Sequence, residues 1–501
     1  MPAPEAKAWR CAICGYVHTG PEAPDLCPVC GAPREVFELE PARQPAASVP
    51  VERWRCLNCT YVHTGAEPPE TCPICGARSD AFEPITETTQ QAAHATGVRR
   101  VVVVGGGVAG LAAAESLRNS SSDIEITLVS KEPALPYYRL NLTRFLAGDI
   151  DEQHLPIKGQ DWFDEQRIGF MREAEVSEIK PEEHQLLLHG GKTLPYDKLV
   201  LAAGAHPFIP PLPGVNREGV TSLRTLANAR QILDAGVSGR RCLCIGGGLL
   251  GLETAGALAR RGAEVTLLEG HGWLMPRQLN EAAGQTLAGY VEAAGITLLT
   301  QARTREIMGD ERVRGVELED GRTVGADLVI VATGVRPNSY LARMAGLEVN
   351  RGIVVDNHLI TSHPDILAAG DVAEHRGVLY GTWAPSEYQG NIAGMNALGA
   401  GVEFGGIPRS NALKVLDVEL FSIGQIQPED ASYQTIDRTD DEGYCRFVFR
   451  DSHLVGAILL GDATVAPRVK KAVESQMDCS GLLAKHPKAA DVIDFLGSAS
   501  D

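Results

Sequence analysis

Two short apolar runs, each followed directly by closely spaced glycines, dominate the hydrophobic pattern of the chain. They cover residues 101–104 and 242–245. An uninterrupted run of β-branched or aliphatic residues predicts a strand buried on both faces of a parallel sheet. Good helix formers follow each glycine cluster. They cover 111–117 after the first cluster and extend to Ala259 after the second. The pattern therefore predicts the same strand–turn–helix unit twice.

Both turns have the spacing Gly-x-Gly-x-x-Gly. Glycine permits a tight turn and lets a pyrophosphate approach the backbone. The N-terminus of the following helix adds N–H donors and a partial positive charge. We therefore expect a dinucleotide at each turn. The six glycines are Gly105, Gly107, Gly110, Gly246, Gly248 and Gly251.

Three later apolar strands end in small residues, which suit a close approach of the backbone to a cofactor. The first, 196–205, contains Gly204, and the last is followed by Gly370. We expect both glycines in the first nucleotide unit. The remaining strand is followed by Gly334, which we expect in the second unit.

An acidic residue commonly closes the second strand of such a unit and binds a ribose. In the second unit this residue is Glu269. Its carboxylate can accept from a free 2′-hydroxyl and repels a 2′-phosphate, which favours NADH over NADPH. His271 lies close by and weakens that preference. In the first unit the candidate is Glu132, and the alternative is a surface turn residue.

Two further charged residues are candidates for cofactor contacts. Arg139 is a candidate for the pyrophosphate of the first unit, because a guanidinium matches phosphate geometry. Glu253 is expected in the first turn of the second unit's helix, where it either faces the nicotinamide or favours the helix dipole. No Ser-His-Asp or metal-His pattern stands out.

The N-terminal part contains an internal repeat, residues 9–38 and 54–83, with a constant offset of 45 residues. Each repeat carries Cys-x-x-Cys, twelve residues and a second Cys-x-x-Cys. A segment of this length cannot be stabilised by a hydrophobic core, and a metal held by four thiolates can supply the missing folding energy. Such a tetrahedral sulfur cage fits iron or zinc. The eight ligands are Cys11, Cys14, Cys27, Cys30, Cys56, Cys59, Cys72 and Cys75.

The repeats resemble the short rubredoxin-like domain of rubrerythrins. The resemblance is carried by Cys-x-x-Cys-Gly-Tyr, by Cys-Pro-x-Cys-Gly-Ala and by a later phenylalanine. It implies one iron per repeat and one-electron transfer. The alternative is a pair of zinc ribbons that serve structure or docking.

Residues 99–401 resemble the FAD-dependent pyridine-nucleotide oxidoreductases. The two glycine fingerprints carry this resemblance, together with Ala-Thr-Gly-Val-Arg-Pro at 332–337 and Ala-Gly-Asp at 369–371. It implies that FAD occupies the first unit and NAD the second, and that Asp371 meets the ribityl chain of the flavin.

Pro-Tyr-Tyr-Arg, Trp-Ala-Pro and the tail resemble NADH:rubredoxin oxidoreductases more narrowly, and also the flavin part of assimilatory nitrite reductases. Trp383 is expected to pack near the flavin ring and is, with Glu253, a possible catalytic residue. The tail is expected to be an interface domain.

The predicted fold class is α/β, with two Rossmann-like domains, a small α+β C-terminal domain and two N-terminal metal-knuckle domains. The expected boundaries are 6–40 and 51–85 for the rubredoxin-like domains, 86–98 for a linker, 99–218 and 337–401 for the FAD-binding domain, 219–336 for the NAD-binding domain and 408–485 for the C-terminal domain.

The chain has 501 residues and a net charge of −18, which opposes binding to nucleic acid and to anionic membranes. No apolar run approaches the ~20 residues of a membrane span. The first residues lack the apolar core of a secretory signal. We therefore expect a cytoplasmic protein.

The sequence and its resemblances predict that electrons pass from NADH through FAD to the chain's own iron centres. A redox protein of the oxygen, peroxide or superoxide reductase type would be the final acceptor. Three alternatives remain open: an NADH oxidase with zinc-binding docking modules, the flavoprotein part of a nitrite-reductase-like system, and an NADH-responsive binding protein. The protein could be a monomer or a homodimer.

Overall fold

The computed structural model describes residues 97–406, 410–416, 418–428, 430–440 and 443–498. Before residue 97 it describes 7–11, 17–20, 23, 34, 37–39, 53–56, 62–64, 67–70, 79 and 82–84. Within this part of the chain, every helix is too short or too polar to cross a bilayer.

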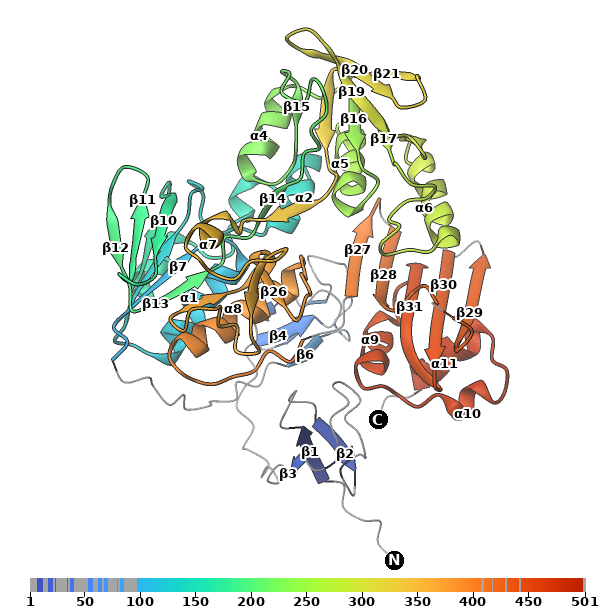
Figure 1. The fold of residues 1–501 in the computed structure, drawn as a ribbon. Helices are drawn as coiled ribbons and strands as arrows, with labels where there is room; N and C mark the ends of the chain where they lie inside the picture. The colour runs from blue at the N-terminus through green and yellow to red at the C-terminus, as the bar shows by residue number, and fades with distance from the viewer. Residues whose placement is uncertain are drawn as a thin grey trace, which may run out of the picture.

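The first nucleotide unit is built on a five-stranded parallel sheet (Figure 1). In spatial order its strands are β25 (Ile366–Ala368), β13 (Lys198–Leu201), β7 (Arg100–Val104), β8 (Glu125–Val129) and β9 (Ile168–Met171). The four valines of β7 are buried, as their apolar run predicts. The helices of this unit are α1 (Val108–Ser120), α2 (Leu142–Ala147), α3 (Gln160–Glu165), α7 (Tyr340–Met344) and α8 (Trp383–Ala397). Of these, α2 packs on the core of the second unit.

The second nucleotide unit repeats this arrangement. Its parallel strands, in spatial order, are β15 (Val220–Thr221), β22 (Leu328–Val331), β16 (Arg241–Ile245), β17 (Glu264–Leu268) and β18 (Thr297–Leu299). Its helices are α4 (Leu226–Asp234), α5 (Leu249–Arg260) and α6 (Glu281–Ala293). Two Rossmann-like units on one chain are thus confirmed.

Small sheets complete both units and join them. Two three-stranded antiparallel sheets contain β10 (Val176–Lys180), β11 (Gln185–Leu188) and β12 (Thr193–Pro195), and β19 (Thr304–Gly309), β20 (Val313–Leu318) and β21 (Thr323–Gly325). The chain crosses between the units at the antiparallel pair β14 (Ala205–Pro207) and β23 (Val335–Pro337). A parallel pair is formed by β24 (Ile353–Val355) and β26 (Ala373–His375).

The C-terminal domain is a five-stranded antiparallel sheet with helices on one face. In spatial order the strands are β27 (Ser410–Val415), β28 (Val418–Gly424), β31 (His453–Gly461), β30 (Gly443–Arg450) and β29 (Tyr433–Asp440). The helices are α9 (Ala466–Glu474), α10 (Ser480–Leu483) and α11 (Ala489–Ser498). Since α11 contributes to the core under this sheet, the domain continues beyond the expected end at residue 485.

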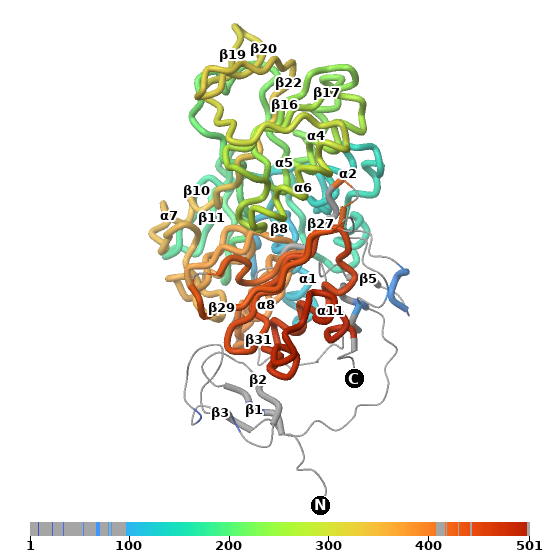
Figure 2. The backbone as a smooth tube through the Cα atoms, turned by 90° about the vertical axis from the view of Figure 1, so that its right-hand side faces the viewer, coloured from blue at the N-terminus to red at the C-terminus, as the bar shows by residue number. Residues whose placement is uncertain are grey.

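The opposite face of this sheet packs on the second nucleotide unit. Leu420 and Leu460 share a core cluster with residues of α5 and α6. Asn280, which caps α6, also donates a hydrogen bond of 2.7 Å from Nδ2 to the hydroxyl of Tyr444. Figure 2 shows β27 reaching up towards α5 and α6. The C-terminal domain is therefore in direct contact with the helix that follows the second glycine turn.

The two N-terminal repeats form matching three-stranded sheets in their described residues. One consists of β2 (Val17–Gly20), β1 (Lys7–Cys11) and β3 (Phe37–Leu39), and the other of β5 (Val62–Thr64), β4 (Arg53–Cys56) and β6 (Phe82–Pro84). Cys11 pairs with Phe37 in the first sheet, and Cys56 pairs with Phe82 in the second. Equivalent residues of the two repeats, 45 positions apart, therefore form the same strand pairs. The predicted sulfur cages themselves lie outside the described residues.

Candidate functional site

Each glycine turn lies at the carboxyl edge of its sheet, where the strand order reverses. The first follows β7, which lies between β13 and β8, and the second follows β16, which lies between β22 and β17. In open parallel sheets a crevice forms at this position and binds the ligand. The predicted dinucleotide turns therefore occupy the expected position in both units.

The first and third glycines of each turn are required by close backbone contacts. Gly105 has a φ of +123°, and a Cβ there would lie 2.0 Å from the carbonyl oxygen of Ala202. A Cβ on Gly110 would lie 1.9 Å from the carbonyl oxygen of Gly105. In the second turn, Cβ atoms on Gly246 and Gly251 would lie 2.5 Å and 1.8 Å from the equivalent carbonyl oxygens. No side chain fits at these four positions.

The middle glycines face open space instead. A Cβ on Gly107 or Gly248 would have no atom within 4 Å. Both residues are N-caps, and within the described part of the chain no side chain caps the N–H groups of α1 or α5. An uncapped helix N-terminus beside an empty cradle is suited to a phosphate. The residues present at both turns therefore fit a bound dinucleotide.

The first unit has further features that fit a large cofactor. Gly370 follows β25 with a φ of +81°, and its N–H donates to Oε1 of Gln389 at 2.8 Å. Gln389 is 1% exposed, and its Nε2 has no hydrogen-bond partner among the residues that the structure describes. A buried amide donor without a partner is costly unless a ligand accepts from it. This donor supports a bound group beside Gly370.

Helix α8 carries Gln389 to this position because it lies directly on α1. A Cβ on Gly390 would be 2.2 Å from the carbonyl oxygen of Ala109, and one on Gly394 would be 2.5 Å from that of Ala113. The two glycines thus permit helix-to-helix backbone contact. Side chains at these positions would lift α8 away from the first glycine turn.

Asp371 is held by one residue of each nucleotide unit. Its Oδ2 accepts from Nη2 of Arg224 at 2.9 Å, and its Oδ1 accepts from Oγ of Ser386 at 3.3 Å. Arg224 also donates from Nε to the carbonyl oxygen of Ala205 at 3.1 Å. These contacts fix the carboxylate at the edge of the first crevice. Its contact with a ribityl chain stays a prediction.

Glu132 and Arg139 form a network with Tyr137. Oε1 of Glu132 lies 2.7 Å from Nη2 of Arg139, and Oε2 accepts from the Tyr137 hydroxyl at 2.7 Å. The same hydroxyl accepts from the backbone N–H of Leu226 at 3.0 Å, which ties the network to α4. Burial, helped by the negative charge of Glu132 and opposed by the positive charge of Arg139, raises the pKa of Tyr137, so the hydroxyl keeps its proton. The predicted roles of Glu132 and Arg139 in FAD binding remain predictions.

The residue that directly closes the second strand differs between the two units. A Cβ on Gly247 would lie 2.9 Å from Oε2 of Glu269, and one on Gly106 would lie 2.8 Å from Oγ of Ser130. Ser130 is therefore the spatial counterpart of Glu269. The carboxylate of Glu269 is 6% exposed and accepts from the N–H groups of Gly247 and His271, at 2.9 Å and 2.7 Å.

Glu253 lies one turn further along α5 than the sequence pattern predicts. Because the helix begins at Leu249, its first turn contains no acidic residue, and the helix-dipole interpretation is wrong. Oε2 of Glu253 accepts a hydrogen bond of 3.1 Å from Oγ1 of Thr143 in α2, a helix of the first unit. The residue is only partly buried, yet burial of its carboxylate raises its pKa to about 7.

Trp383 begins α8 and stacks on Tyr138. The ring centroids are 5.2 Å apart, and the planes are inclined by 22°. Ser386, one turn later on α8, contacts Asp371. The aromatic pair therefore lies on the same helix as the groups that border the first crevice.

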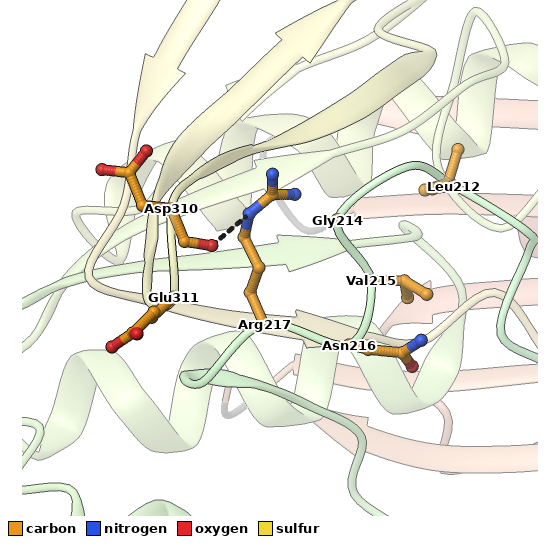
Figure 3. A pocket seen from close by; sticks show the side chains of 7 residues that line it. All are labelled: Leu212, Gly214, Val215, Asn216, Arg217, Asp310 and Glu311. Carbon is orange, nitrogen blue, oxygen red and sulfur yellow. Dashed lines mark hydrogen bonds between the residues drawn. The ribbon is translucent and has the colours of Figure 1, made fainter.

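Two other features among the described residues are less suited to a ligand. The pocket in Figure 3 has a volume of about 320 Å³, and Arg217 donates across it to the carbonyl oxygens of Asp310 and Ile307. It lies in the outer part of the second unit, away from both turns.

The second feature is a cluster of His184, His363 and Asp365. Lys198 already binds Oδ1 of Asp365 at 2.6 Å, and Nδ1 of His363 accepts from the Asp365 N–H at 3.2 Å. The ammonium of Lys198 therefore already neutralises the only carboxylate of this cluster.

Several residues at the crevices carry no recognisable signal in the sequence. Arg224 and Asp371 are 147 residues apart, and Thr143 and Glu253 are 110 residues apart. Neither Arg224 nor Thr143 lies in a spaced motif. Ser130 could have been found by aligning the two fingerprints with each other, because both second strands end directly before this position.

Family models match almost the whole chain. Residues 99–390 match the pyridine nucleotide-disulphide oxidoreductase model, and 410–477 match the rubredoxin NAD+ reductase C-terminal domain. Residues 9–38 and 54–83 each match the rubredoxin-like domain of rubrerythrin. These matches agree with both resemblances expected from the sequence.

Individual relatives carry related names. A nitrite reductase [NAD(P)H] of Bacillus subtilis is 36% identical over 387 residues, which is 77% of this chain and 48% of the relative. An NADH-rubredoxin oxidoreductase of Clostridium acetobutylicum is 29% identical over 75% of this chain and 94% of the relative. The chain spans about half the length of the nitrite and nitrate reductase relatives that it matches.

Solved structures agree with the fold. The covalent putidaredoxin reductase–putidaredoxin complex contains a chain with a TM-score of 0.73 and 26% identity, covering 80% of this chain and 99% of that one. The NADH:rubredoxin oxidoreductase from Clostridium acetobutylicum has a TM-score of 0.67 and 27% identity, covering 79% and 99%.

The two kinds of glycine in the first turn predict different outcomes on substitution. Gly107→Ala adds a methyl group to open space, so we expect the unfolding free energy of the FAD-free protein to change by less than about 1 kcal/mol. The methyl group would occupy the phosphate cradle, and FAD affinity should fall at least about tenfold. Gly110→Ala forces a backbone clash and should cost about 3 kcal/mol or more.

FAD retention after dialysis and urea unfolding of the FAD-free protein measure the two effects. Full FAD retention by Gly107→Ala would contradict the assignment of the cradle.

The raised pKa of Glu253 predicts how stability varies with pH. The pKa rises from 4.5 to about 7 on folding, so between these values the folded protein keeps a proton that the unfolded chain releases. The free energy of unfolding should therefore decrease as pH rises from about 4.5 to about 7. Glu253→Gln should remove this decrease, so the variant gains stability relative to the parent at pH 8 but not at pH 4.5. Urea unfolding at both pH values measures this difference in stability. Parallel profiles of unfolding free energy against pH for the variant and the parent would refute the prediction.

Proposed function

Because the chain belongs to the pyridine nucleotide-disulphide oxidoreductase family, we propose that it oxidises NADH through FAD and reduces the two iron centres of its own N-terminal repeats. From these centres, electrons would pass to a redox protein. One NADH yields NAD⁺, a proton and two electrons, and two four-cysteine sites that each take one electron match that number.

The observation that carries the proposal is the combination of two open phosphate cradles with two four-cysteine repeats on one chain. The cradles at Gly107 and Gly248 lack any side chain within reach. The repeats lie at 9–38 and 54–83 and match a rubredoxin-like model. FAD, when bound, would supply the conversion of a two-electron donor into single-electron transfers.

The chain's own residues would hold and orient the two dinucleotides. In the first unit Gly105, Gly107 and Gly110 would accommodate the pyrophosphate, while Asp371 and the Gln389 amide border the remainder of FAD. In the second unit the N-terminus of α5 would bind the pyrophosphate of NADH. Glu253, whose carboxylate contacts Thr143 of the first unit, would face the nicotinamide.

The choice of NADH over NADPH would depend on Glu269. Two backbone N–H groups hold its carboxylate at the end of β17, where an adenosine ribose is expected. A fixed negative charge at this position accepts from ribose hydroxyls and repels a 2′-phosphate.

The cysteine pattern favours electron transfer to metal over disulfide chemistry. The sequence contains no cysteine between residues 76 and 241. A disulfide relay beside the flavin would need at least one cysteine in the first nucleotide unit. Metal held by the N-terminal thiolates would then be the acceptor within the chain.

The linker at 86–98 would allow the repeats to reach the flavin. About 13 residues can extend to ~45 Å, and a tether of this length implies a roughly millimolar local concentration of the repeats. The aromatic pair of Tyr138 and Trp383 is a candidate outlet for the electrons.

The final acceptor is proposed to be a redox protein of the oxygen, peroxide or superoxide reductase type. A reductase in complex with its redox partner has a similar fold, which supports a protein acceptor. A homodimer stays an alternative to a monomer.

A second candidate function is the flavoprotein part of a nitrite-reductase-like system. The 36% identity to a nitrite reductase over 387 residues favours it. In this case electrons would leave for a separate nitrite-reducing component. An NADH oxidase with zinc in the repeats is a third candidate, and metal analysis distinguishes it, because iron would be absent.

Anaerobic addition of NADH tests the proposed route. Two equivalents of NADH, which supply four electrons, should bleach both the flavin absorbance, which takes two, and the visible thiolate–iron band of the two centres, which take one each. A Cys14→Ser, Cys59→Ser variant is the matched control, and its flavin should still bleach. Flavin bleaching with a persistent iron band in the parent protein would refute the internal route.

Glu269→Gln tests nucleotide selection. The amide keeps the shape of the side chain but removes its charge, so the preference for NADH over NADPH should fall about tenfold, which corresponds to 1.4 kcal/mol. The ratio of kcat/KM values for the two nucleotides measures it. Ser130→Ala, at the equivalent position of the first unit, should leave this ratio unchanged, and an equal effect of both variants would contradict the assignment.

A further inference from the structure

The turn between β27 and β28 contains an apolar residue in an unfavourable conformation. Val415 pairs with Val418, so two residues, 416 and 417, connect the strands. Leu416 has a φ of +53°, in the left-handed region that favours glycine or asparagine. Two-residue hairpin turns normally place such residues here. The presence of leucine indicates that its side chain has a role of its own.

The equivalent turn between β30 and β31 shows what this sheet uses when the turn has no such role. Arg450 pairs with His453, and the two connecting residues are Asp451 and Ser452, with φ values of 49° and 63°. Both are polar and conform to the usual preference for this turn. The first residue of each turn, Leu416 and Asp451, thus has a similar positive φ, and the two residues differ in chemistry.

Leu416 fits into a notch on α5. A Cβ on Gly256 would lie 2.5 Å from Cδ2 of Leu416, so the missing side chain of Gly256 leaves the space that Leu416 fills. Gly256 is buried, and Leu416 packs on the core cluster that contains α5 and α6. Glycine inside a helix costs about 1 kcal/mol relative to alanine, so its presence here fits the contact.

Helix α5 is the element that joins the functional parts. Its N-terminus, at Gly248, forms the second phosphate cradle, and Glu253 contacts Thr143 of the first unit. Near its end, Nε of Arg261 donates to the carbonyl oxygen of Leu146 at 2.9 Å. Glu253 and Gly256 are three positions apart and therefore lie on neighbouring parts of the helix surface.

We propose that Leu416 is a positioning residue, a wedge from the C-terminal domain that holds α5 and keeps Glu253 against Thr143. The inference rests on the proposed NADH oxidation, because the second cradle and the first unit must be correctly spaced for hydride transfer. Reacting atoms need to approach to about 3–3.5 Å, and small displacements reduce the rate strongly.

Leu416→Asn is the direct test, since asparagine suits the turn but cannot fill the notch. In anaerobic stopped-flow reduction of bound FAD, the NADH concentration for half-maximal rate should rise at least about threefold, and the limiting rate should fall about fivefold or more. FAD content should stay at the parental level. Ser452→Asn, at the equivalent turn, is the matched control and should change neither quantity.

Hydrogen exchange provides a readout that is independent of catalysis. In the full-length protein, the amides of residues 249–260 should exchange faster in Leu416→Asn than in the parent or in Ser452→Asn. Leu416→Met, which can refill the notch, should restore both exchange and kinetics. If Leu416→Asn does not fold, Leu416→Ala takes its place. Its amides at 249–260 should then exchange faster, and its FAD should be reduced more slowly, than in Leu416→Met.

The outcomes separate the two proposals. If Leu416→Asn has the same hydrogen exchange and the same reduction kinetics as the parent, the proposed role of Leu416 is wrong. Failure of NADH to reduce FAD in the parent protein would overturn the proposed function, while the exchange comparison would still decide whether Leu416 holds α5.

Discussion

Both nucleotide units depend on one backbone contact, the third glycine of each turn lying against the carbonyl oxygen of the first. A Cβ would be 1.9 Å or less from that oxygen in either unit. The contact lets the helix begin directly at the carboxyl end of the strand, with its N–H groups facing the crevice. A similar close contact occurs where α8 crosses α1, because Gly390 lies directly against the backbone carbonyl of Ala109. Close backbone approach therefore shapes both the cradle and its border.

The two units use the same geometry for different purposes. In the second unit a buried carboxylate, Glu269, closes the second strand and braces the turn through the Gly247 N–H. In the first unit a neutral hydroxyl, Ser130, occupies that place, and the carboxylate lies further along, at Glu132, paired with Arg139. The acidic group of the first unit thus belongs to a network that also joins the units through Tyr137 and Leu226.

Features that depend on neighbouring residues in the sequence could be predicted from it. The buried valine strand, both glycine turns and the repeated cysteine pattern are local and follow from spacing alone. Contacts between distant segments could not be predicted. The pairing of Arg224 with Asp371 needs the orientation of the two units, and the approach of Glu253 to Thr143 needs the packing of α5 on α2. The displacement of Glu253 from the expected first turn shows the same limit, because the start of a helix is set by its cap.

Helix α5 has a consequence for how the protein acquires its structure. Gly251 and Gly256 lie within its twelve residues, and each weakens an isolated helix by about 1 kcal/mol. Short segments of this kind gain most of their helicity from tertiary packing. The second nucleotide unit would then become ordered late in folding, after α2 and the C-terminal sheet are available as templates. A nascent chain that has emerged only as far as residue 400 would lack one of these templates, so assembly of the second nucleotide unit would follow synthesis of the C-terminal domain.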